Sequence, residues 1–158
     1  MSGVRIIPWR DDLADVFRDI NIEWVSSMFV MEPMDYAQLD DPQGTILAQG
    51  GTILFAETGD LGVVGTGALM KAGEGSYEVA KMGVRPAAQG RGAGEALLMA
   101  LIEEARARDA KELFLLTNAR CVAAVRLYER AGFVHDVGIM DRYGAEYERA
   151  DVAMSFSI

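Results

Sequence analysis

Cysteine and histidine are the scarcest reactive residues in this chain, with one of each among 158 residues. A single cysteine, Cys121, excludes an intramolecular disulfide and a cysteine-based zinc site, and it is typical of a protein that works in the reducing cytoplasm. A single histidine leaves a paired-histidine metal site without its second ligand, and it supports a serine–histidine relay only if His135 itself is the base. We therefore expect no metal site and a cytoplasmic location.

The chain also has few positive charges and no long apolar run. Lysine and arginine number 15 against 24 acidic residues, for a formal net charge of −9. That charge repels nucleic acid and anionic membranes, so we expect neither as a partner, although a local site can still hold an anion. An acidic surface either attracts a cationic amine or serves solubility alone. No segment approaches the roughly 20 apolar residues needed to cross a bilayer, and Arg5, Pro8 and Asp11 interrupt the region where an export signal would lie.

What the sequence does contain is the composition of a folded domain, with 51% hydrophobic and 25% charged residues. A chain of this length can bury about two-thirds of its unfolded surface around one core. No repeat, linker or low-complexity segment divides it, so residues 1–158 are predicted to form a single domain.

Apolar spacing predicts a mixed α/β fold. Leu97, Leu101 and Ala105 recur at helical spacing, whereas Val152 and Met154 alternate with less apolar residues as in a strand. In chain order the patterns predict a strand at 4–7, a helix at 13–32, a helix-and-loop segment at 35–49, strands at 52–57, 63–70 and 77–84, a helix at 92–108, a strand at 113–116, a helix at 122–131 and one or two final strands ending at 152–158.

A glycine-rich segment, Gln89-Gly90-Arg91-Gly92-Ala93-Gly94, connects the third of these central strands to the clearest helix. We call it the glycine loop. Free N–H groups at a helix N-terminus carry roughly +0.5 of an elementary charge, and glycine lets an anion approach them closely. A dinucleotide signature would need glycine where Glu95 stands, and a P-loop would need lysine followed by serine or threonine. A pyrophosphate site or a plain tight turn remain as alternatives, with Arg91, Arg85 and Lys81 as nearby positive charges.

Two segments resemble the GNAT superfamily of N-acetyltransferases. Met82-Gly83-Val84-Arg85-Pro86 with the glycine loop resembles its coenzyme A-binding signature, whose core is Gln/Arg-x-x-Gly-x-Gly/Ala. The segment from Ala124 to Phe133 resembles the family pattern A-x-x-L-Y-E-x-x-G-F. The resemblance spans roughly residues 52–133 and implies a mixed, mostly antiparallel central sheet of six or seven strands flanked by about four helices.

The resemblance also implies acetyl-coenzyme A as the cosubstrate, with its pantetheine arm against backbone groups of Met82 and Val84. Family members often carry asparagine seven residues before the tyrosine, where this chain has Cys121, so Asn118 is a candidate substitute. The positions that the resemblance assigns to the cofactor are Met82, Gly83, Val84, Gln89, Gly90, Arg91, Gly92, Ala93, Gly94, Glu95, Asn118 and Ala124.

Two side chains match catalytic positions of the family. Tyr128 matches the general acid, because a phenol with a pKa of about 10 is protonated at neutral pH and can donate to a departing thiolate. An amine with a pKa near 10.4 must lose a proton before it attacks, at about 4–5 kcal/mol at pH 7, and Glu78 stands where many members place the base. The alternatives are a core aromatic for Tyr128 and an exposed strand carboxylate for Glu78, while Glu57 is a weaker base candidate.

The acceptor is not specified by these motifs. The main hypothesis is direct transfer to an amine of a small molecule or amino acid; the alternatives are a noncatalytic acyl-coenzyme A-binding or sensor module, another acyl group, or a protein amine. Apolar residues at 24–36, namely Trp24, Met28, Phe29, Met31, Met34 and Tyr36, form either the acceptor wall or plain core. The alternating tail at 152–158 is compatible with a homodimer.

Overall fold

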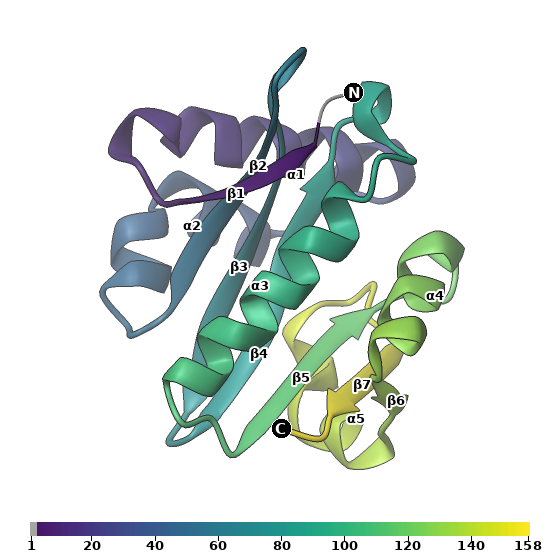
Figure 1. The fold of residues 1–158 in the computed structure, drawn as a ribbon. Coiled ribbons are helices and arrows are strands. Elements are labelled where there is room, and N and C mark those ends of the chain that lie inside the picture. Colours follow the sequence, from purple (N-terminus) through teal and green to yellow (C-terminus); the bar gives the residue numbers. More distant parts are fainter. Residues whose placement is uncertain (1–2) are drawn as a thin grey trace.

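The computed structural model describes residues 3–158, which form one seven-stranded sheet in the order β1-β2-β3-β4-β5-β7-β6 (Figure 1). Every neighbouring pair is antiparallel except β4 and β5, which are parallel. The strands are β1 (Val4–Pro8), β2 (Thr52–Thr58), β3 (Gly62–Gly73), β4 (Ser76–Val84), β5 (Glu112–Thr117), β6 (Val134–His135) and β7 (Val152–Phe156). The expected mostly antiparallel sheet of six or seven strands is confirmed.

Helices cover both faces of this sheet. They are α1 (Ala14–Met28), α2 (Pro33–Asp40), α3 (Ala93–Ala107), α4 (Val122–Ala131) and α5 (Val137–Tyr143). In Figure 1, α3 crosses the front of the strands, while α1 and α2 lie behind them. None of these helices is long and apolar enough to span a bilayer, over the residues described.

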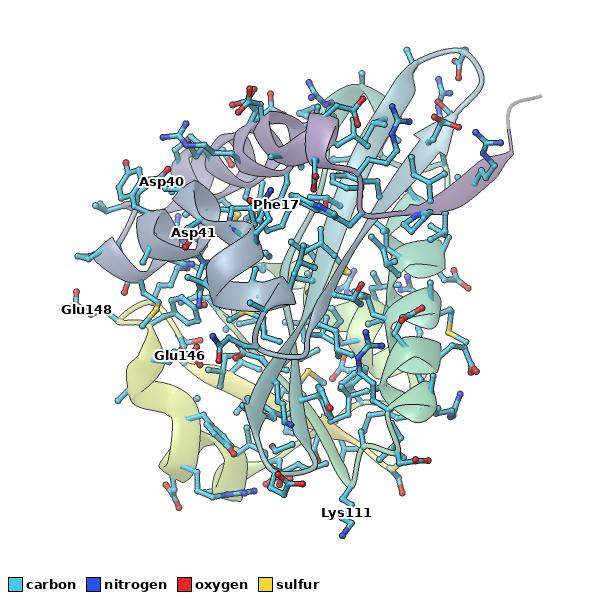
Figure 2. All side chains as sticks on the ribbon, turned by 90° about the vertical axis from the view of Figure 1, so that its left-hand side faces the viewer. Phe17, Asp40, Asp41, Lys111, Glu146 and Glu148 are labelled. Atoms are coloured by element: carbon cyan, nitrogen blue, oxygen red, sulfur yellow. The ribbon has the colours of Figure 1, made fainter. Side chains whose placement is uncertain are left out.

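Strand β2 shows why the sheet needs helices on both sides. Its side chains alternate, so Leu54 and Ala56 join the core under α3, and Ile53 and Phe55 join the core under α1 and α2. Figure 2 shows Phe17 of α1 in this second layer, where its side chain is fully buried.

One expected helix was too long, and one helix was not expected at all. The helix predicted for residues 13–32 ends at Met28, because Phe29 is extended with φ −140° and ψ 171°. The chain then turns into α2, for which Pro33 stands in the first turn. Helix α5 was not predicted, because it is short and begins with Val137 and a glycine. Its start is marked by Asp136, whose carboxylate accepts from the Ile139 N–H at 3.2 Å.

Candidate active site

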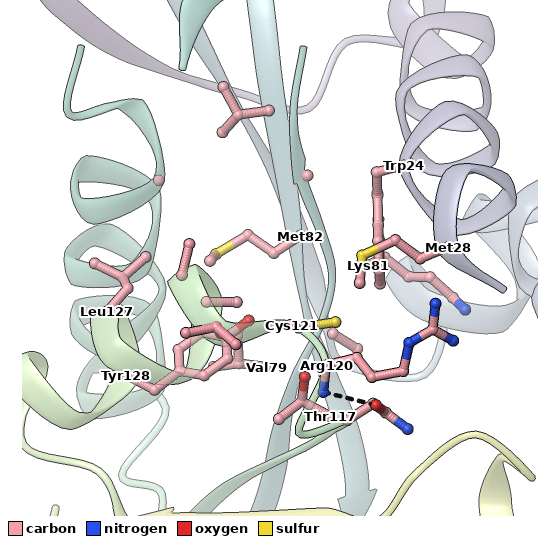
Figure 3. Close-up of a pocket in the computed structure, with 18 of the residues that line it drawn as sticks. Trp24, Met28, Val79, Lys81, Met82, Thr117, Arg120, Cys121, Leu127 and Tyr128 are labelled. Atoms are coloured by element: carbon pink, nitrogen blue, oxygen red, sulfur yellow. Dashed lines mark hydrogen bonds between the residues drawn. The ribbon is translucent and has the colours of Figure 1, made fainter. Parts of the chain in front are cut away.

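The central feature of the site is a separation between two parallel strands. Strands β4 and β5 pair from Ser76 opposite Glu112 to Val79 opposite Leu115 and share no paired residues beyond that point. Both strands continue past it, and a cavity of about 720 Å³ opens between their ends. The glycine loop, the end of α1 and the start of α4 form the other walls (Figure 3).

A β-bulge bends β4 at this separation. Thr66 of β3 lies opposite Gly83, whereas Ala68 lies opposite Ala80, so β4 carries an extra residue. Within it, Lys81 has a positive φ of 53°, a conformation that non-glycine residues adopt at a cost of about 1–3 kcal/mol. The buried ion pair described below holds Lys81 in place. The bulge therefore lies directly after the last β4 residue that pairs with β5.

The glycine loop leads into α3 as the sequence predicts. Gly90 and Gly92 have φ of 85° and 83°, and a side chain at either would meet no neighbouring atom, so these glycines are required by backbone conformation. Gly94 instead allows close packing, because a Cβ there would lie 3.3 Å from Leu127 Cδ2. No side chain caps the start of α3, so its first N–H groups face the cavity without a side-chain acceptor.

The structure brings most of the predicted cofactor positions together around the cavity. Its wall includes Met82, Gly83, Val84, Gln89, Gly90, Gly92, Ala93, Gly94, Asn118 and Ala124. Arg91 and Glu95 are not part of that wall, and the Arg91 guanidinium instead bonds both carboxylate oxygens of Asp60 at 2.8 Å. The glycine loop therefore offers an anion backbone N–H groups rather than this arginine.

Tyr128 packs in the core and also lines the cavity. It is 8% exposed, and its ring packs edge-on to Phe133 with centroids 6.1 Å apart. Burial, with a smaller contribution from nearby Cys121, raises the pKa of Tyr128 well above its usual value of 10. No residue of the described chain hydrogen-bonds its hydroxyl, which lies on the cavity side in Figure 3. The side chain is thus a protonated donor at neutral pH.

Glu78 is buried rather than exposed, so the alternative of a solvated strand carboxylate is wrong. It is 3% exposed and lines the cavity. Burial raises its pKa well above the usual range, and the charge of Glu146 and a hydrogen bond to Glu146 raise it further. The weaker base candidate, Glu57, pairs instead with Arg5 at the β1 edge and is not in the cavity wall. No sequence pattern marked Glu146, which comes from the turn after α5.

The loop between β5 and α4 contains Cys121, which stands where family members often have asparagine, and Asn118, the candidate substitute. The Asn118 side chain donates to the Arg149 carbonyl at 2.7 Å, and its Oδ1 accepts from the Arg120 N–H at 2.8 Å. Its amide is therefore engaged in fixing this loop. Cys121 lines the cavity just before α4 and does not cap that helix with its side chain.

A buried ion network that the sequence analysis missed supports one side of the cavity. Asp35 of α2 accepts from Lys81 Nζ at 2.8 Å and from Arg149 at 2.7 Å, and Glu32 also pairs with Arg149 at 3.1 Å. The Tyr147 ring lies 4.9 Å from Lys81 Nζ and 4.8 Å from the Arg149 guanidinium carbon. The network ties α2, β4 and the segment before β7 together.

Part of the expected apolar wall is present. Trp24, Met28 and Phe29 line the cavity, whereas Met31, Met34 and Tyr36 do not. The Trp24 indole N–H donates to Asn21 Oδ1 at 3.1 Å, which fixes the ring. A Cβ on Gly83 would lie 2.4 Å from Trp24 Cδ1, so this glycine permits α1 to close on β4.

Comparisons with known proteins agree with this architecture. Residues 11–133 match the Acetyltransferase (GNAT) family. An acetyltransferase of GNAT family from Staphylococcus aureus MU50 superposes with a TM-score of 0.86 at 16% identity, covering 98% of both chains. A putative acetyltransferase from Salmonella typhimurium, solved with acetyl-CoA, gives a TM-score of 0.68 at 21% identity over 85% of this chain and 81% of that one.

Curated relatives are similar over shorter segments. An IAA acetyltransferase from Azospirillum brasilense is 39% identical over 85 residues, 53% of this chain and 55% of that protein. A mycothiol acetyltransferase from Streptosporangium roseum is 42% identical over 66 residues, 41% of this chain and only 20% of that protein. The fold and the family match place the protein among the acetyltransferases. Within that class, the chain belongs to the GNAT family.

Proposed function

We propose that this protein is an acetyl-coenzyme A-dependent N-acetyltransferase that acts in the cytoplasm and transfers the acetyl group directly to an amine of a small molecule or amino acid. One observation carries the proposal: a single cavity includes the uncapped start of α3, the separated ends of β4 and β5, Tyr128 and Glu78. Its volume of about 720 Å³ falls in the range of small-molecule sites.

The residues present fit the cosubstrate. The first-turn N–H groups of α3 suit a pyrophosphate, since glycines at 90 and 92 leave that backbone open. Met82 and Val84 lie on the part of β4 that has no partner in β5 and so offer backbone hydrogen bonds to a pantetheine arm. When bound, acetyl-coenzyme A supplies an activated thioester.

Glu78 and Tyr128 each carry out one of the two proton transfers that the reaction needs. Glu78, once ionised, accepts the proton that the amine must lose, and its raised pKa makes it a stronger base than an ordinary carboxylate. Tyr128 holds its proton at neutral pH and donates it to the departing sulfur. Both side chains are buried, which strengthens their contributions because charges interact more strongly at low dielectric.

The proposal is tested by incubating the purified protein with acetyl-coenzyme A and a panel of amines and amino acids, while free thiol is followed with a chromogenic reagent. Thiol release that depends on the amine is expected, and Tyr128→Phe should slow it. Tight binding of acetyl-coenzyme A without thiol release for any acceptor would reject the enzyme and favour a noncatalytic acyl-coenzyme A-binding module.

A further inference from the structure

The cavity wall contains four charged side chains, Glu78, Lys81, Arg120 and Arg149. Two of them are neutralised within the protein, because Lys81 pairs with Asp35, and Arg149 pairs with both Asp35 and Glu32. These two cations and two carboxylates carry no net charge. The ionisable groups left facing the cavity without an ion pair in the described chain are therefore the carboxyl of Glu78 and the guanidinium of Arg120.

The position of the Arg120 guanidinium suits the binding of a planar anion. Its guanidinium carbon lies 5.1 Å from the centre of the Phe29 ring. A guanidinium over an aromatic face keeps its edge N–H groups available, and that edge matches the two oxygens of a carboxylate. Within residues 3–158, Arg120 forms no ion pair with an acidic side chain, although acidic residues outnumber basic ones by 24 to 15.

The backbone under Arg120 is held in place as well. Its N–H donates to Asn118 Oδ1 at 2.8 Å, and the Asn118 amide bonds the Arg149 carbonyl, so two loops fix the base of the side chain. Figure 3 shows Arg120 reaching from this loop toward Met28 of α1, on the side of the cavity away from Leu127 and Tyr128. The pyrophosphate position proposed above lies instead at the start of α3.

We infer that the acceptor is an α-amino acid with an apolar side chain, whose carboxylate binds Arg120 and whose amine faces Glu78. This inference rests on the proposed function and specifies its acceptor. A carboxyl group that can accept a proton and a guanidinium lie in a single cavity, and they complement an amino acid, whose amine gives up a proton and whose carboxylate is negative. Trp24, Met28 and Phe29 supply apolar surface for its side chain.

The test compares each amino acid with the amine that lacks only its carboxylate: phenylalanine with phenethylamine, and leucine with 3-methylbutylamine. The wild-type protein should acetylate the amino acid of each pair with the higher kcat/KM. Arg120→Gln should lower kcat/KM for the amino acids about 10- to 100-fold, mainly through KM, as expected for losing a charge-assisted pair. Its effect on the two amines should be much smaller, and Arg120→Lys should restore part of the loss.

Arg126→Gln is the matched control, because Arg126 is an exposed arginine on α4 outside the cavity wall, and it should leave all four kcat/KM values unchanged. Equal losses for amino acids and amines in Arg120→Gln would overturn the inference, and so would a rise confined to the KM of acetyl-coenzyme A. A wild-type protein without preference for the carboxylate would overturn it directly.

Calorimetry separates failure of this inference from failure of the proposed function. Phenylalanine and phenethylamine are titrated into the wild-type protein and Arg120→Gln, each saturated with coenzyme A. Tighter binding of phenylalanine that Arg120→Gln abolishes supports the inference even without turnover, in which case only the proposed catalysis fails. Equal affinity for the two ligands refutes the inference whether or not acetyl transfer occurs.

Discussion

Replacing Asp35 with asparagine should destabilise the protein far more than the same change at Asp40 of the same helix. Both aspartates lie on α2 and both accept from a basic side chain at 2.8 Å. The Asp35 side chain is 1% exposed and its partner Lys81 is 4% exposed, whereas Asp40 and its partner Arg18 are 56% and 39% exposed (Figure 2 shows Asp40 at the outside). The two substitutions thus differ in burial and in the number of partners, because Asp35 also accepts from Arg149 and from the Glu32 N–H.

The magnitude follows from what each substitution leaves behind. Asp35→Asn leaves Lys81 buried without its counter-charge and removes one of the two carboxylates that pair with Arg149, so a loss of about 3–5 kcal/mol in the free energy of unfolding is expected. Asp40→Asn breaks an exposed pair, for which about 0.2–1 kcal/mol is expected. Domains of this kind are stable by about 5–15 kcal/mol, so the first variant is expected to remain measurable.

Urea unfolding followed by tryptophan fluorescence measures both changes. The pH dependence supplies a second readout: burial raises the pKa of Asp35, but hydrogen bonds from Arg149 and Lys81 outweigh it and leave that pKa well below its usual value. A lowered folded-state pKa gives stability that is present above the unfolded pKa, near 4, and is lost as the pH falls below it. The difference between wild type and Asp35→Asn should therefore shrink below about pH 4. A loss under 1 kcal/mol at pH 7 would refute the reasoning.

Three further predictions concern catalysis and cofactor binding. Tyr128→Phe should lower kcat about 100-fold or more with little change in the KM of acetyl-coenzyme A, and an unchanged kcat in thiol-release kinetics would remove Tyr128 as the acid. Gly92→Val should raise the dissociation constant of coenzyme A about tenfold in titrations, because a side chain at φ 83° costs about 1–2 kcal/mol in the loop. The kcat/KM profile should rise with pH as Glu78 loses its proton, above the ordinary carboxylate pKa of 4.5. Glu146→Gln should move that rise to lower pH, and an unmoved profile would separate Glu146 from the base.

Much of the fold could be predicted because most of the strands and the long helices carry a local apolar pattern. The stripe of α3 and the alternation in β7 are local signals that the tertiary structure keeps. The end of α1 could not be predicted in this way, since the helix stops where Phe29 becomes extended and no proline or glycine marks that position. Helix α5 is too short to show a period at all.

The residues of the candidate site also differ in whether a local sequence pattern reveals them. The glycine loop and Tyr128 were found because each belongs to a contiguous motif. Glu146 and Asp35 were missed because their partners are distant in sequence: Arg149 is 114 residues from Asp35, and no spacing rule connects them. Acidic residues are frequent in this chain, so nothing but the fold distinguishes these two from carboxylates on the surface.

The sequence reveals one end of the cavity and not the other because the two ends present different chemical groups to a ligand. At the glycine loop the ligand-facing groups are backbone N–H, so the sequence needs only glycines and a helix start, and that requirement leaves a recognisable motif. At the other end the ligand-facing groups are side chains brought by α1, the β5–α4 loop and the segment before β7. Changes at Arg120 or Phe29 can therefore alter acceptor choice while the glycine loop stays intact, which is why the motif indicates the cofactor and the three-dimensional charge arrangement indicates the acceptor.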